Sequence, residues 1–282
     1  MSDWRPIHTP TSGSSLVMGF SAPVSSGSSP NYGKLLTGGA ASTFGNWTWV
    51  ANAPTIPMGG FVLNISNNSG SPKYVIQLGH ATSGSTQLIC DKVMFQSPRS
   101  AQGMYSYYLP LYLPTSGSIL ARSSDSAGAS TISVSIEPFP LGLLSPFVLS
   151  KTQSYGFAAG DGTGATAVDP GVTLNVKGAF AQLHPAISNP IRYMIIMIGN
   201  NNNAAMVTCL WRLDIAIGGA GSEKVIVPDV VVSAEATADD VDPHVVGLPI
   251  YVPSGVRLSA RSQCSINDAT DRLLDVAVLG LS

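Results

Sequence analysis

The sequence contains one segment twice, and this duplication constrains the fold more than any other feature. Residues 109–123 read LPLYLPTSGSILARS and residues 248–262 read LPIYVPSGVRLSARS, an offset of 139 (248 − 109). Seven of the fifteen positions are identical, whereas unrelated stretches of average composition share about one. Upstream, residues 74–85 match residues 211–222 at an offset of 137. The chain is therefore expected to fold as two copies of one module.

Each copy consists of short apolar or alternating runs bounded by Gly, Pro, Asn and Ser, which is typical of antiparallel strands. The clearest runs are residues 46–50, 61–65, 74–78, 87–90 and 131–136. We find no window with the spacing of apolar residues and the cap that predict a helix. With about eight such runs per copy, the pattern predicts an all-β chain with two tandem, duplicated, jelly-roll-like antiparallel β-sandwich domains.

Composition suggests the domain boundaries. Residues 1–29 are rich in Ser, Gly and Pro and are expected to form an extended arm. Residues 30–139 are predicted to form the first β-sandwich module and residues 153–282 the second. Residues 140–152 join them as a Pro-rich linker that is expected to be stiff.

The low charge of the chain excludes several partners. The chain has 14 Lys and Arg against 16 Asp and Glu, and its charged fraction is 11%, less than half of the roughly 25% that is usual. Nucleic-acid binding needs clustered basic side chains, so we expect no nucleic-acid partner. No apolar run is long enough for a membrane span, and residues 1–5 do not have the pattern of a secretion signal, so we expect neither. A weakly charged protein has little repulsion to keep it monomeric, so self-association is expected.

The three cysteines indicate a reducing compartment. Cys90, Cys209 and Cys264 form no C-x-x-C motif and cannot all be paired. This pattern fits a protein that is made and kept in a cytoplasm. We expect these cysteines to be buried and to act as small hydrophobic residues.

Four residues of the duplicated segment are candidates for an interface. Proline cannot donate to a strand ladder, so the prolines around Tyr112 and Tyr251 place both tyrosines at a sheet edge or near a turn. We expect each tyrosine ring to be buried with its hydroxyl at a polar rim, as a packing motif; the alternative is a contact with a neighbouring subunit or a sugar. Arg122 and Arg261 are expected to cover apolar surface with their stems or, alternatively, to anchor a carboxylate or an interface.

Nothing in the sequence predicts catalysis or a bound metal. Asp239, Asp240 and Asp242 form the one acidic cluster, and such carboxylates can hold Ca²⁺. The cluster lacks the twelve-residue loop pattern and has no acidic counterpart in the first copy, so a solvated loop is the favoured interpretation. The four histidines are scattered and no nucleophile or zinc motif is present. We expect no enzyme activity, no catalytic residue and no cofactor.

Three tryptophans raise the alternative of a tandem carbohydrate-binding module. Trp47, Trp49 and Trp211 could stack against a sugar. Trp47 and Trp49 alternate with polar residues, however, so they are expected to share one strand face and to belong to the core.

The two copies of the segment, at residues 109–123 and 248–262, resemble stretches found in structural proteins of tailed bacteriophage particles. In those proteins β-strand modules carry similar apolar-Pro-apolar-x-apolar-Pro runs followed by Ala-Arg, and the match covers about a tenth of this chain. The resemblance implies a virion protein assembled in the host cytoplasm. It implies a capsid decoration or cement protein that binds the major capsid protein and copies of itself, as a homotrimer.

Other roles remain open beside this one. A tail-fibre or baseplate receptor-binding adhesin would present aromatic and polar loops, and a glycan is a partner only for that role or for a carbohydrate-binding module. A double jelly-roll major capsid protein is a further alternative, although clear similarity between its two barrels would be unexpected.

Overall fold

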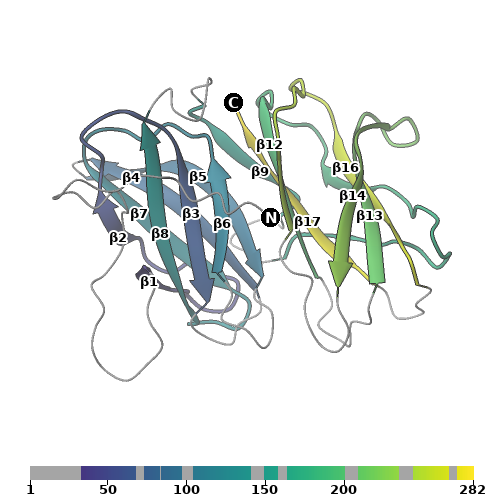
Figure 1. Cartoon of the computed structure of the whole chain (residues 1–282), viewed down its shortest axis with the longest axis horizontal. Coiled ribbons are helices and arrows are strands. Elements are labelled where there is room, and N and C mark those ends of the chain that lie inside the picture. Colours follow the sequence, from purple (N-terminus) through teal and green to yellow (C-terminus); the bar gives the residue numbers. More distant parts are fainter. Residues whose placement is uncertain are drawn as a thin grey trace, which may run out of the picture.

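A computed structural model describes most of the chain beyond the predicted arm (Figure 1). The described residues are 33–67, 73–82, 84–96, 104–140, 149–157, 164–200, 209–234, 244–266 and 272–282. In these ranges every regular element is a β-strand, which confirms the all-β prediction. The described part therefore holds no helix of the length and hydropathy that a membrane span requires. The arm predicted at residues 1–29 lies outside the described residues.

The first half of the chain forms a β-sandwich, here called module 1. Its strands are β1 (Lys34–Thr37), β2 (Thr48–Asn52), β3 (Met58–Asn67), β4 (Lys73–Thr82), β5 (Ser85–Gln96), β6 (Met104–Leu109), β7 (Ser118–Asp125) and β8 (Thr131–Pro140). They make two antiparallel sheets, in the orders β1-β8-β3-β6 and β2-β7-β4-β5. The first strand thus pairs with the eighth, the second with the seventh, the third with the sixth and the fourth with the fifth, which is the strand order of a jelly roll.

The second half, module 2, follows the same order. Its strands are β9 (Thr152–Tyr155), β10 (Thr166–Val168), β11 (Ala181–His184), β12 (Tyr193–Asn200), β13 (Cys209–Ile217), β14 (Lys224–Ala234), β15 (His244–Leu248), β16 (Leu258–Cys264) and β17 (Leu274–Leu281). The two sheets are β10-β17-β12-β15 and β11-β16-β13-β14. β9 and β10 pair with successive parts of β17, so together they take the place that β1 holds in module 1.

The repeat extends to the register of individual residues. Tyr74 lies opposite Phe95, and Trp211 lies opposite Val232, both at an offset of 137 (211 − 74 and 232 − 95). The register shift between β4 and β5 next to Ile76 recurs between β13 and β14 at the matching position. The offset of the sequence match is therefore also the offset of the paired strands.

Loops repeat as well as strands. Before β2 the amide of Gly45 donates to the carbonyl of Ser123, and before β11 the amide of Gly178 donates to the carbonyl of Ser262. Three residues earlier in each loop, Ser42 and Asn175 have φ angles of 58° and 56°.

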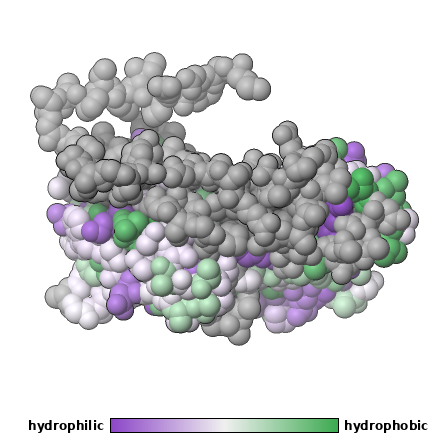
Figure 2. All heavy atoms as spheres, turned by 90° about the horizontal axis from the view of Figure 1, so that it is seen from below, coloured by the Kyte–Doolittle hydropathy of each residue, from purple (hydrophilic) through white to green (hydrophobic). Residues whose placement is uncertain are grey.

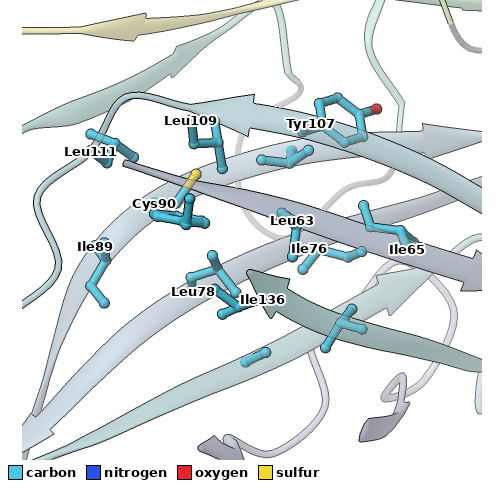
Figure 3. Close-up of a cluster of buried hydrophobic side chains, with 14 of the residues drawn as sticks. Leu63, Ile65, Ile76, Leu78, Ile89, Cys90, Tyr107, Leu109, Leu111 and Ile136 are labelled. Carbon is cyan, nitrogen blue, oxygen red and sulfur yellow. The ribbon is translucent and has the colours of Figure 1, made fainter. Parts of the chain in front are cut away.

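Each module has a core between its two sheets. In module 1 the side chains come from both sheets, for example Leu63 from β3 and Ile76 and Leu78 from β4 (Figure 3). In module 2 the core surrounds the fully buried Trp211. Cys90, Cys209 and Cys264 are buried and unpaired, as the sequence predicts.

The two modules pack directly against each other (Figure 1). All eight residues of β17 are buried because the strand has an apolar neighbour on both faces. Val276 and Val278 pack in the core of module 2, whereas Ala277, Leu279 and Leu281 join the core cluster of module 1. The chain is therefore a body of two modules with a shared buried cluster.

Candidate functional site

The predicted arginines occupy matching places on the two modules. Arg122 on β7 donates from Nε to Oε1 of Gln77 on β4 at 2.9 Å. Arg261 on β16 donates from Nε to Oδ2 of Asp214 on β13 at 2.9 Å. Gln77 and Asp214 differ by the same offset of 137, and each lies directly across the strand pair from its arginine. Each arginine therefore has a polar partner within its own module.

Both guanidinium groups also lie over aromatic rings. The Cζ atom of Arg122 is 4.6 Å from the ring centre of Phe44 and 4.5 Å from that of Trp47, and Arg261 is 4.5 Å from Phe180. Trp47 directly precedes β2 and Phe180 directly precedes β11. These stacked pairs are cation–π contacts, and they hold in place the residues that directly precede β2 and β11. Arg261 thus anchors a carboxylate, and both arginines cover aromatic surface.

Asp214 is the centre of a charged cluster on module 2. Its carboxylate accepts hydrogen bonds from Nζ of Lys177 at 2.7 Å, from the amide of Asp229 at 3.0 Å and from Arg261. Burial raises the pKa of Asp214, but these donors outweigh it and hold the pKa below the ordinary value. The cluster ties the loop before β11 to β13, β14 and β16, so its role is structural.

Tyr112 and Tyr251, the tyrosines predicted as interface candidates, face away from the core. Leu111 and Leu113 are buried on either side of the partly exposed Tyr112, and Val252 is buried beside Tyr251. The side chain of Tyr251 is 66% exposed, so the expectation of a buried ring is wrong there. The reason is alternation along an extended segment: Val252 bridges to Ile191 and occupies the inner side.

The expectation that Trp47 and Trp49 belong to the core is also wrong. Trp49 is 50% exposed, and Trp47 is only partly buried, with ring atoms 3.0 and 3.1 Å from the place that a Cβ of Gly79 would take. The register of β2 shifts after Trp49, so that Val50 and Ala51 are the buried residues of the strand. Of Trp47, Trp49 and Trp211, only Trp211 is a core residue.

Side chains from β9 cover the edge of β5 where the modules meet. The hydroxyl of Thr152 accepts from the amide of Asp91 at 2.9 Å and donates to the carbonyl of Ile89 at 3.3 Å. The hydroxyl of Ser154 accepts from the amide of Lys92 at 2.8 Å and donates to its carbonyl at 3.0 Å. Backbone groups of an edge strand are thereby satisfied without a further strand.

Charged and apolar contacts complete the contact between the modules. Nζ of Lys73 lies 2.5 Å from Oδ2 of Asp275, whose side chain is fully buried. The amide of Met94 donates to the sulfur of Met197 at 3.3 Å. This contact holds the two modules in one fixed arrangement.

The outer surface carries exposed apolar side chains, and the largest group is on module 2. Figure 2 shows apolar surface gathered at the right-hand end of the molecule, which module 2 forms. Five exposed apolar residues of module 2, here called the module 2 face, lie in the loop before β11 and on β13 and β14: Val172, Leu174, Val176, Leu210 and Val231.

Within the described residues no group of three His, Cys, Asp or Glu side chains is placed to hold a metal ion. Asp239, Asp240 and Asp242 lie outside the described residues, so their binding of a cation stays untested.

Comparisons with known proteins give weak structural similarities. No protein-family model and no curated protein matches the chain. A structure of PNGF-II has a TM-score of 0.40 and 10% identity over 94% of this chain, which spans 65% of that protein. The tandem CBM22-1–CBM22-2 domain of Xyn10C from Paenibacillus barcinonensis has a TM-score of 0.26 and 10% identity, over 81% of this chain and 80% of that one. The T13 IBDV viral particle has a TM-score of 0.24 and 11% identity, over 88% and 67%. With TM-scores of 0.40 or lower, these similarities do not assign the chain to a family.

Proposed function

We propose that this protein is a non-enzymatic structural component of a phage virion, assembled in the host cytoplasm. Its role is that of a capsid decoration or cement protein, which binds the major capsid protein and copies of itself. The observation that carries the proposal is the combination of two firmly joined modules with an exposed apolar face at one end. A body of fixed shape can bridge neighbouring subunits of a shell, because its two ends keep a constant spacing.

The use of charge within the chain supports a structural role. Asp214 is held by Lys177 and Arg261, and Lys73 and Asp275 pair across the two modules. These charged groups hold strands and loops of the protein itself together. The charged fraction of the chain is only 11%, so little charge opposes association with a neutral surface.

The exposed apolar face supports a binding role. Isolated apolar side chains on a surface are normal, but a contiguous group marks a contact with another macromolecule. Many such contacts on a repetitive shell add through multivalency, so that each single contact can be weak. The homotrimer implied by the phage resemblance is part of this proposal, since a trimer would present three such faces.

Quantitative mass spectrometry of purified particles tests the proposal. We expect the protein in many copies per particle, in a fixed ratio to the major capsid protein. Adding the purified protein to particles that lack it should raise their resistance to heat and low salt. Absence from particles, together with a monomer at high concentration, would contradict the proposal.

The exposed aromatic residues favour a second candidate function, glycan binding by an adhesin or a carbohydrate-binding module. Tyr251 is 66% exposed and Trp49 is 50% exposed, and each presents a ring that could stack on a sugar. A glycan array with the wild-type protein and with Tyr251→Ala and Trp49→Ala distinguishes the two functions. Binding that is lost in either variant would favour the second candidate.

A further inference from the structure

Two of the three cysteines lie together at one end of module 2. Cys209 is the first residue of β13 and Cys264 is the last residue of β16, and these two strands pair with each other. Cys264 lies directly opposite Trp211, so Cys209 is its diagonal neighbour on the same face of the sheet. The two thiols hydrogen-bond to each other. Module 2 thus holds a pair of adjacent nucleophilic groups that the proposed function does not use.

The surroundings of Cys264 suit a thiolate. Its sulfur accepts hydrogen bonds from the thiol of Cys209 and from the amides of Ser265 and Ile266. The thiol of Cys209, these amides and the positive charge of Arg272 outweigh burial and hold the pKa of Cys264 below its ordinary value. The pKa of Cys209 is raised, because its thiol donates to Cys264 and because it is buried. Cys264 is therefore the thiol that ionises, and Cys209 is the thiol that keeps its proton.

The first copy holds a carboxylate at the position of Cys264. Asp125 lies opposite Tyr74 as Cys264 lies opposite Trp211, and the two residues are equivalent at the offset of 139 (264 − 125). The carboxylate of Asp125 is buried and accepts from the amide of Ala127, two residues further along the chain, at 3.0 Å. In module 2 a sulfur takes the place of this carboxylate and also accepts from amides that follow it. The repeated module therefore provides donors for an anion at the end of this strand.

Arg272 adds a positive charge beside the pair. Its Nη1 atom lies 3.4 Å from the sulfur of Cys209, and its charge also acts on Cys264. The carbonyl of Arg272 accepts from Nε1 of the buried Trp211 at 3.3 Å, which holds the backbone of this arginine next to the two strands. A cation at this place favours the thiolate of Cys209 as well, at the moment when Cys209 gives up its proton.

We propose that Cys209 and Cys264 form a peroxide-reactive dithiol that closes into a disulfide within module 2. Cys264 is the nucleophile and Cys209 is the thiol that resolves the first product. The oxidant is hydrogen peroxide. Both cysteines are buried, but each is the terminal residue of its strand, and strand ends open locally at a low cost in free energy. A molecule as small as peroxide needs only such a brief opening.

The reaction consists of two displacements at sulfur and oxygen. The thiolate of Cys264 attacks one oxygen of the peroxide, the O–O bond breaks, and the hydroxide that leaves takes a proton from solvent to become water. The sulfur of Cys209 then attacks the sulfur of the Cys264 sulfenic acid. The S–O bond breaks, and the hydroxide leaves with the proton of Cys209 as a second water. In total, two thiols are oxidised to one disulfide and one peroxide is reduced to two waters.

The disulfide would make module 2 more resistant to unfolding. It closes a loop of 55 residues (264 − 209) that includes β14 and β15. A cross-link of this length restricts the unfolded chain more than the folded one, so the oxidised protein should melt roughly 5 °C above the reduced protein. An unchanged melting temperature would overturn this stabilising role. The inference goes beyond the proposed function, since the purified chain is measured without any particle.

Mass spectrometry of the full chain tests the dithiol. After reduction and removal of the reductant, we expect one equivalent of hydrogen peroxide to remove two hydrogen atoms from the intact mass, and dithiothreitol to restore them. Peptide mapping should find Cys209 linked to Cys264. Cys90 lies in the core of module 1 and should stay reduced, so Cys90→Ser should behave like the wild type. An unchanged mass, or a disulfide that includes Cys90 or joins two chains, would overturn the proposal.

Single substitutions separate the roles of the two cysteines. In Cys209→Ser, the oxidation of Cys264 should stop at the sulfenic acid, which dimedone traps. In Cys264→Ser, dimedone should label Cys209 at least about tenfold more slowly, because the thiolate and not the thiol attacks peroxide. Circular dichroism shows whether each variant is folded, and Cys264→Asp, with the residue type of Asp125, replaces Cys264→Ser if that variant is not. Equal labelling of the two cysteines would overturn the assignment of Cys264 as the nucleophile.

Discussion

At the scale of single residues, Gln77 and Asp214 show how one position serves two copies differently. The side-chain amide of Gln77 accepts a hydrogen bond from Arg122 and donates one to Asp91, so this one side chain links three strands. Asp214 accepts from Lys177 and Arg261, and its ionised form is what both cations require. Because a glutamine side chain does not titrate and an aspartate does, we expect the stability of module 2 alone to depend on pH at this position.

Replacing Asp214 with Asn is expected to lower the free energy of unfolding by about 2 kcal/mol, since Lys177 would lose its buried partner. The folded chain holds the pKa of Asp214 below its ordinary value of 3.8. Ionised Asp214 therefore stabilises the fold above that value, and the contribution is lost as pH falls through it toward the lower folded pKa. Urea unfolding should show a larger difference between variant and wild type at pH 7 than at pH 3. An equal difference at both pH values would contradict this assignment.

The sequence reveals these positions only in part. The aligned segments contain Gln77 and Asp214 as well as both arginines, so the offsets alone show that Gln77 is equivalent to Asp214 and Arg122 to Arg261. That each arginine contacts its partner depends on the pairing of distant strands, which the offsets do not give. The sequence pattern does not predict that Tyr251 and Trp49 are exposed. In an apolar run where every residue can be buried, the side that faces inward is decided by distant partners such as Ile191, and these are not visible in the local pattern.

At the scale of elements, the loop that enters the second strand of each module depends on a glycine. A Cβ at Gly45 would meet the carbonyl oxygen of Thr37, and a Cβ at Gly178 would meet that of Asp169. Both atoms are backbone atoms and cannot move aside without shifting the loop. The two loops should therefore respond alike to the same change.

We expect Gly45→Ala and Gly178→Ala each to destabilise the protein by about 2 kcal/mol, as for other forced backbone shifts. Gly164 is the control, because nothing lies within 4 Å of a Cβ there. Thermal unfolding followed by circular dichroism should show lower melting temperatures for the first two variants and no change for Gly164→Ala. A neutral effect at Gly45 or Gly178 would mean that the loop is not fixed by this contact.

The strands could be predicted from the sequence more readily than the order in which they pair within the sheets. Runs such as residues 61–65 and 131–136 lie within β3 and β8, because alternation is a local property. Sheet order depends on pairings between distant segments, which alternation does not specify. The split of the first strand of module 2 into β9 and β10 is likewise set by pairing with β17.

At the scale of the whole molecule, the ion pair between Lys73 and Asp275 joins the two modules. Lys73→Leu leaves Asp275 buried without this cation and is expected to cost about 3 kcal/mol. The double variant Lys73→Leu with Asp275→Ser removes both charges, so it leaves no buried unpaired charge and should recover most of the loss. A double-mutant cycle in urea measures the coupling. Additive losses would show that the two side chains do not act as a pair.

The shared core also predicts how the molecule unfolds. A stiff linker between separate modules would allow two independent transitions, but Ala277, Leu279 and Leu281 of module 2 are buried in the cluster of module 1. If one module unfolded alone, these side chains would be exposed. Both modules would lose stability, because apolar burial contributes about 25 cal/mol per Å². Calorimetry of the full chain should therefore give one transition with equal calorimetric and van't Hoff enthalpies. Leu279→Glu should separate it into two, since a charge in the shared cluster weakens the contact while each sandwich keeps its own core.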